Sequence, residues 1–103
     1  MTYGCLIGSL SLDMAESWPD LRVRLAAMFS ALRDFVAGIV TGAAAAAAPG
    51  RTDIDAGAFG DQFLSVVEGS IVLAKAHADP STPQRQMALL GQHLDLLLGA
   101  GAA

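Results

Sequence analysis

The stretch from Phe59 to Leu98 constrains the fold most, because it contains two apolar helical patterns separated by one sharp break. Within the break, the residues from Ser81 to Gln84 read STPQ and match the capping box. This motif has a hydroxyl at the cap, here with a proline in the first turn and a glutamine three residues after the cap. We therefore expect one helix to end near Asp79 and a second helix to begin at Ser81, so that the two form an antiparallel hairpin.

The first helix of this hairpin is apolar on two sides, and such a helix needs two partners. One stripe, at three- and four-residue spacing, contains Phe59, Phe63, Val66, Ser70, Leu73 and His77. The second stripe contains Leu64, Val67, Ile71, Ala74 and Ala78. The second helix carries a heptad seam of Met87, Leu90, Leu94 and Leu97. One short domain cannot easily provide packing surfaces for both stripes, so the pattern predicts a dimerisation element. It does not indicate which stripe faces the second subunit. The predicted dimer interface comprises Phe63, Val66, Ser70, Leu73, His77, Met87, Leu90, Leu94 and Leu97.

Two further helical patterns precede the hairpin. The first covers residues 3–17 and is weakened by glycines and serines. The second follows a start signal, with Ser17 as the cap and a proline in the first turn, and we expect a helix from Trp18 to about Ala45. Its last apolar residues, Ile39 and Val40, are predicted to lie in the core. The alanine run at 43–48 either extends this helix or forms a low-complexity connection.

After the alanine run, Asp53 and Asp55 are alternative caps for the helix that includes Phe59. A glycine after Leu98 closes the last helix. Short turns and the lack of any alternating strand pattern indicate an all-α fold. We therefore predict one domain over residues 1–103 with four main helices, the last two of which form the antiparallel hairpin.

Charge and composition exclude several functions. The net charge is −4 and the six basic residues are scattered, so this segment does not have the basic face that binding to nucleic acid requires. The longest uncharged run, from Phe35 to Gly50, is short of the ~18–20 residues of a membrane span. Cys5 is the one cysteine, which fits a reducing compartment, and the start of the chain does not resemble a secretory signal. We expect a soluble cytoplasmic protein without membrane contact.

The sequence contains no constellation typical of an enzyme. His77 and His93 are the two histidines, and no orienting group accompanies either of them or Cys5. No zinc spacing or phosphate-binding loop occurs, so we expect no catalytic residue, no metal site and no cofactor. A histidine at a two-fold interface would make dimerisation sensitive to pH, which we state as a hypothesis.

Three segments resemble the C-terminal domain of TetR-family transcriptional regulators. They are GCLIG at 4–8, PDLR at 19–22, and EGSIVLAK at 68–75, which is followed by Asp79-Pro80. The resemblance extends from about Gly4 to Leu98. It implies an effector-binding and dimerisation domain, in which the last two helices pair with those of a second subunit as a four-helix bundle. The earlier helices would enclose a pocket for a small apolar effector.

The family also carries an N-terminal helix-turn-helix that reads DNA, and nothing in this sequence corresponds to it. By this resemblance, DNA would be contacted only through a domain absent from this chain. The chain is then an excised domain, a truncated gene product or a lone domain without DNA contact, and we favour a fragment.

The implied effector pocket has a candidate lining of Leu6, Leu10, Trp18, Met28, Phe29, Leu32, Gln62 and Glu68. Glu68 is either a polar anchor in this pocket or a residue that faces water or pairs with an arginine. The stripe that includes Met28 and Leu32 is either pocket lining or plain core. The alternative function is a helical homodimerisation or assembly module without any ligand.

Overall fold

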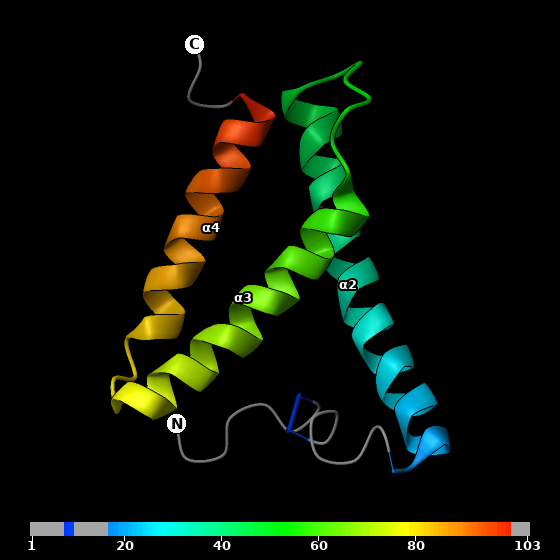
Figure 1. Ribbon diagram of the computed structural model, residues 1–103. Helices are drawn as coiled ribbons and strands as arrows, with labels where there is room; N and C mark the ends of the chain where they lie inside the picture. The colour runs from blue at the N-terminus through cyan, green and yellow to red at the C-terminus, as the bar shows by residue number, and fades with distance from the viewer. Residues whose placement is uncertain (1–7, 10–16, 100–103) are drawn as a thin grey trace.

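A computed structural model describes residues 8–9 and 17–99 of the chain (Figure 1). It contains three long helices: α2 (Pro19–Ala47), α3 (Ala56–His77) and α4 (Thr82–Leu98). The described residues include no strand, so the all-α prediction is confirmed for them. The helix expected over residues 3–17 lies outside the described residues, apart from two helical residues at 8 and 9.

Helix α2 begins at Pro19, because proline has its φ already set for a helix and lacks the N–H that would be unsatisfied there. The predicted serine cap is wrong. Trp18 occupies the cap position, makes no side-chain capping bond, and accepts a 2.9 Å hydrogen bond at its carbonyl from Arg22. At the other end the helix continues to Ala47, so most of the alanine run extends it.

Helix α3 is capped by Asp55, whose carboxylate accepts a 2.9 Å hydrogen bond from the Ala58 N–H. This bond decides between the two candidate caps. The helix ends at His77, and Ala78 then adopts the left-handed conformation, with φ of 51°. The N–H groups of Ala78 and Asp79 donate to the carbonyls of Ala74 and Lys75 in the last turn of the helix.

Helix α4 begins one residue after Ser81, close to the prediction, but the capping box does not form. The Ser81 hydroxyl instead donates to the Asp79 carboxylate at 2.6 Å, and the Ser81 N–H donates to the same oxygen at 3.0 Å. The helix ends at Leu98, and Gly99 takes the left-handed conformation with φ of 73°. The prediction that this glycine closes the last helix is confirmed.

The three helices form a thin, open arrangement in which α3 crosses α2 and then turns back into α4 (Figure 1). Their core is a small cluster of Val40, Phe59 and Leu90, one residue from each helix. The molecule measures 48 × 33 × 14 Å. Because packed helices lie about 8–10 Å apart, the shortest dimension allows two helix layers at most.

The overall dimensions show that one copy of the chain is less compact than a typical monomer. Its accessible surface is 6954 Å², whereas a compact monomer of this size exposes about 5,400 Å². Its radius of gyration is 15.8 Å, against about 13 Å for a compact domain of the same length. Large apolar side chains, including Ile39 at 57% exposure, therefore remain in contact with solvent. The prediction that Ile39 is core is wrong, whereas its neighbour Val40 is the most deeply buried large side chain.

The two apolar stripes of α3 are partly covered within the chain. Phe63 and Val66, from the first stripe, pack on the core cluster together with Met87 and Leu94 of α4. The second stripe continues the helical spacing of Gly60, which lies against the backbone of Arg33 in α2. Leu73 and His77 of the first stripe remain exposed, so the second subunit stays a prediction.

Candidate functional site

The residues predicted to form a dimer interface divide into an inner and an outer set. Ser70 and Leu90 are buried, and the Ser70 hydroxyl donates to the Val67 carbonyl at 2.9 Å. Phe63, Val66, Met87 and Leu94 are half-buried against the core cluster. The exposed members are Leu73, His77 and Leu97.

One side of the hairpin packs on the core cluster, and its other side also carries apolar residues. On α4, Leu89 is 55% exposed and Leu96 is 75% exposed, and His93 lies between them at helical spacing. On α3, Gln62 and Leu73 fall on one exposed stripe. We call this surface the outer face of the hairpin, and define it as Gln62, Leu73, Leu89, His93, Leu96 and Leu97. Sequence reasoning missed Leu89 and Leu96 as interface candidates, although their spacing of seven residues places them on one side of a helix.

Two neighbouring hollows mark the outer face, with volumes of about 290 and 200 Å³. Both are lined by Gln62 of α3 and His93 of α4. The His93 ring lies against the Phe59 ring with a centroid separation of 6.1 Å and an interplanar angle of 43°. His93 therefore connects the outer face with the core cluster.

Arg51 closes one end of the larger hollow. It forms a 2.8 Å ion pair with Asp53 and also donates to the carbonyl of Leu97 in the last turn of α4. The side-chain hydrogen bond raises the pKa of Arg51 and lowers the pKa of Asp53. A cation at a helix C-terminus is favourable, so Arg51 stabilises the end of α4 against the loop that precedes α3.

Of the residues predicted to line an effector pocket, Trp18 and Gln62 line different described hollows. Leu6 and Leu10 lie outside the described residues, and Gln62 lines the two hollows of the outer face instead. Met28 and Leu32 are exposed and Phe29 is half-buried. Together with Phe35 and Ile39, Met28 and Leu32 form an exposed apolar stripe along α2.

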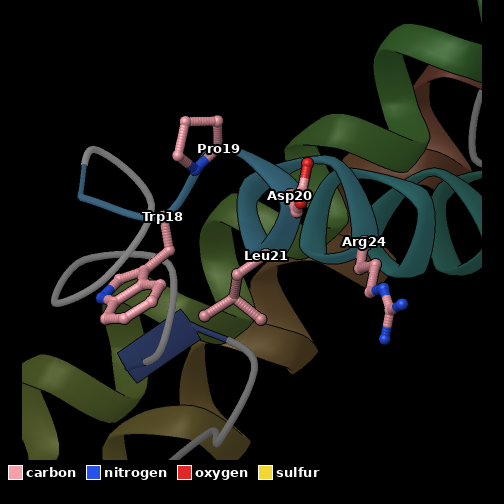
Figure 2. A pocket seen from close by; sticks show the side chains of 5 residues that line it. All are labelled: Trp18, Pro19, Asp20, Leu21 and Arg24. Atoms are coloured by element: carbon pink, nitrogen blue, oxygen red, sulfur yellow. The ribbon is translucent and has the colours of Figure 1, made fainter.

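Trp18 lines a hollow of about 460 Å³ at the N-terminal end of α2. Its other lining residues are Pro19, Asp20, Leu21 and Arg24. Figure 2 shows the Trp18 ring and the Leu21 side chain pointing to the same side of the helix, with Arg24 one turn further along. The hollow thus combines an aromatic and an aliphatic wall with one acidic and one basic group at its rim.

Glu68 faces the N-terminal part of the chain. A Cβ added to Gly8 would collide with the Glu68 carboxylate, so Gly8 lets the two segments approach closely. Glu68 is half-buried, and no buried side-chain oxygen or nitrogen in the described part of the chain is left without a hydrogen-bond partner.

A family model described as tetracyclin repressor-like, C-terminal domain matches residues 1–90. The chain belongs to this family. Comparison with curated proteins and with solved structures gives no match. The resemblance noted in the sequence is thereby confirmed, and the all-helical described residues agree with a helical TetR-like C-terminal domain.

TetR-like C-terminal domains belong to transcriptional regulators, which are not enzymes, and they generally bind effectors and dimerise. Within residues 8–9 and 17–99 of this TetR-like domain, no three or more metal-ligating side chains lie together. Over the same residues, no helix combines the length and the hydropathy needed to cross a bilayer.

Proposed function

We propose that this chain is the effector-binding and dimerisation domain of a TetR-like, cytoplasmic transcriptional regulator. A small apolar effector would favour one of two helix arrangements and so change the spacing of DNA-binding domains carried elsewhere in the regulator. Membership of the family supports this proposal, and so does the outer face of the hairpin, where large leucines are exposed in a single chain.

The outer face is the best candidate for the dimer contact. Leu73, Leu89, Leu96 and Leu97 of this surface are all exposed, and apolar side chains of this kind form the centre of dimer interfaces. Leu89 and Leu96 are exposed and do not pack in the core of one chain. A second copy could therefore cover them without disturbing that core. Of the interface predicted from the sequence, Leu73 and Leu97 belong to this surface, and Val66 borders the smaller hollow.

The dimer is tested by the molar mass in solution, measured by light scattering across a dilution series. We expect a dimer for the wild type and a monomer for the double variant Leu89→Glu/Leu96→Glu, since burying four unpaired carboxylates per dimer is strongly unfavourable. The matched control is Ala88→Glu, because Ala88 is exposed on the flank of α4 that carries Asp95. A wild-type monomer, or a double variant that stays dimeric, would remove the outer face from the proposal.

The hollow beside Trp18 is the candidate effector site. Its aromatic and aliphatic walls suit a small apolar molecule, and Asp20 and Arg24 would orient a polar group on that molecule. Trp18 is the one tryptophan of the chain, so its fluorescence reports directly on this hollow.

The effector site is tested by screening small apolar compounds for a rise in melting temperature and a change in Trp18 emission. We expect Leu21→Ser to weaken both responses to any compound that binds. The control is Val23→Ser, because Val23 is exposed on a different side of α2. Binding that is unaffected by Leu21→Ser would place the effector elsewhere.

A homodimerisation module without ligand is the second candidate function, because the exposed leucines require a partner copy but not an effector. It predicts the same dimer and the same effect of the glutamate variants. It differs in that no compound raises the melting temperature while also changing Trp18 emission.

A further inference from the structure

His93 occupies the middle of the outer face of the hairpin. It lies one turn after Leu89 and one turn before Leu96 and Leu97, and the side chains of all four are exposed. It also borders both hollows of this face and lies against the Phe59 ring. Any partner that covers the exposed leucines therefore also covers the imidazole.

The charged groups around His93 come from one segment. Arg51, Asp53 and Asp55, in the loop before α3, line the larger hollow with it. Arg51 is paired with Asp53, and the Asp55 carboxylate accepts the capping hydrogen bond of α3. The lining residues from α3 are uncharged.

On α4 itself, the residues that line the two hollows with His93 are also uncharged: Gln86, Leu89, Leu90 and Leu97. No residue of α2 lines either hollow. Once Arg51 and Asp53 are paired, Asp55 is the one remaining charged residue that lines the hollows, and its carboxylate already caps α3. It is therefore the nearest negative charge that could stabilise a positive imidazolium.

We propose that protonation of His93 dissociates the dimer. The two copies associate when both imidazoles are neutral and separate when His93 is protonated. This inference rests on the proposed function, because it assumes that the outer face is the dimer contact. Its physical basis is desolvation: an imidazolium is hydrated in the free chain and loses that hydration against apolar side chains of a second copy.

Proton linkage sets the size of the effect. Each dimer buries two copies of His93, and an imidazole ordinarily titrates near pH 6.5. If protonation is fully incompatible with association, the dissociation constant rises about 100-fold between pH 7.5 and pH 5.5. Partial hydration of the interface reduces this rise, and we expect at least a ten-fold change.

The test measures the dimer dissociation constant at pH 7.5, 6.5 and 5.5, at one salt concentration, by analytical ultracentrifugation. The variants are His93→Gln and His93→Leu, which cannot be charged. The matched control is His77→Gln, since His77 is the other histidine and lies exposed at the C-terminal end of α3, outside both hollows. Circular dichroism at each pH establishes that the helices remain folded.

We expect the wild type and His77→Gln to lose affinity by at least ten-fold at pH 5.5, and both His93 variants to change by less than three-fold. A pH dependence that persists in His93→Gln and His93→Leu would overturn the inference, and so would a wild-type dimer that does not respond to pH. Failure of the proposed function looks different, because the wild type would then be a monomer already at pH 7.5.

Discussion

At the scale of single residues, the crossing of α2 and α3 depends on Gly60. A Cβ at this position would lie 2.7 Å from the carbonyl oxygen of Arg33 and 2.8 Å from its Cγ. The carbonyl belongs to the backbone of α2 and cannot move without shifting that helix. Gly60 is buried, and the glycine is therefore required by packing, although glycine weakens a helix interior.

We predict that Gly60→Ala destabilises the protein. Overpacking of this kind costs about 1–3 kcal/mol, which exceeds the gain of about 1 kcal/mol from better helix propensity. The control is Gly38→Ala on α2, where nothing lies within 4 Å of an added Cβ and stability should rise by up to about 1 kcal/mol. Urea unfolding of both variants gives the comparison. Equal stabilisation by the two alanines would show that α2 and α3 do not cross closely at Gly60.

At the scale of elements, the turn between α3 and α4 is organised by Asp79. Its carboxylate accepts hydrogen bonds from the Ser81 hydroxyl, the Ser81 N–H and the Arg85 guanidinium, at 2.6, 3.0 and 3.1 Å. These bonds, with the hydroxyl the largest contributor, lower the pKa of Asp79 to about 2. The ionised carboxylate thus holds the hairpin turn together.

We predict that part of the stability of the hairpin is lost in acid. Because the pKa of Asp79 is lower in the folded state than the usual unfolded value of about 3.9, its contribution is complete above that value. It disappears as the pH falls through about 2. The unfolding free energy measured from pH 6 to pH 2 should therefore fall less steeply for Asp79→Asn than for the wild type. Asp95→Asn, an exposed aspartate of α4, is the control and should follow the wild-type slope.

Local signals in the sequence predict the ends of these elements well. Pro19, Asp55 and Gly99 act through backbone geometry or a bond to the nearest turn, so they need no tertiary information. The capping box failed because Asp79 competes for the Ser81 hydroxyl. The sequence shows that Ser81 has a hydroxyl. It does not show whether this hydroxyl accepts from a backbone N–H of α4 or donates to the Asp79 carboxylate.

The partners of each helix face were not predictable in the same way. Leu89 and Leu90 are adjacent in the sequence, yet Leu90 is 6% exposed and lies in the core while Leu89 faces outward. A heptad pattern identifies α4 as apolar on a broad face, but the orientation of α4 depends on contacts with α2 and α3. For the same reason the predicted pocket residues, such as Gln62 and Trp18, lie in separate hollows.

At the scale of the whole molecule, two apolar surfaces of the described residues each expose several large side chains. One is the outer face of the hairpin, and the other is the stripe of Met28, Leu32, Phe35 and Ile39 on α2. Monomeric proteins rarely leave contiguous apolar surface of this kind in water. The proposed association through the outer face would therefore contribute to stability without altering the core of each copy.

This separation of core and surface predicts different responses to urea at different protein concentrations. Unfolding of a dimer has a midpoint that rises with concentration, because association stabilises the folded state alone. For Leu96→Glu, we expect a midpoint that does not depend on concentration and that equals the wild-type value at high dilution, since Leu96 is not part of the core.

Leu90→Ala provides the opposite case, because Leu90 belongs to the core cluster. Removing its side chain leaves a cavity that costs about 2–5 kcal/mol, so the midpoint should fall at every concentration while its rise with concentration persists. If Leu96→Glu instead lowered the midpoint equally at all concentrations, Leu96 would be stabilising the single chain. In that case the excess surface of one copy would not be explained by association through α4, and the exposed stripe of α2 would become the surface to test next.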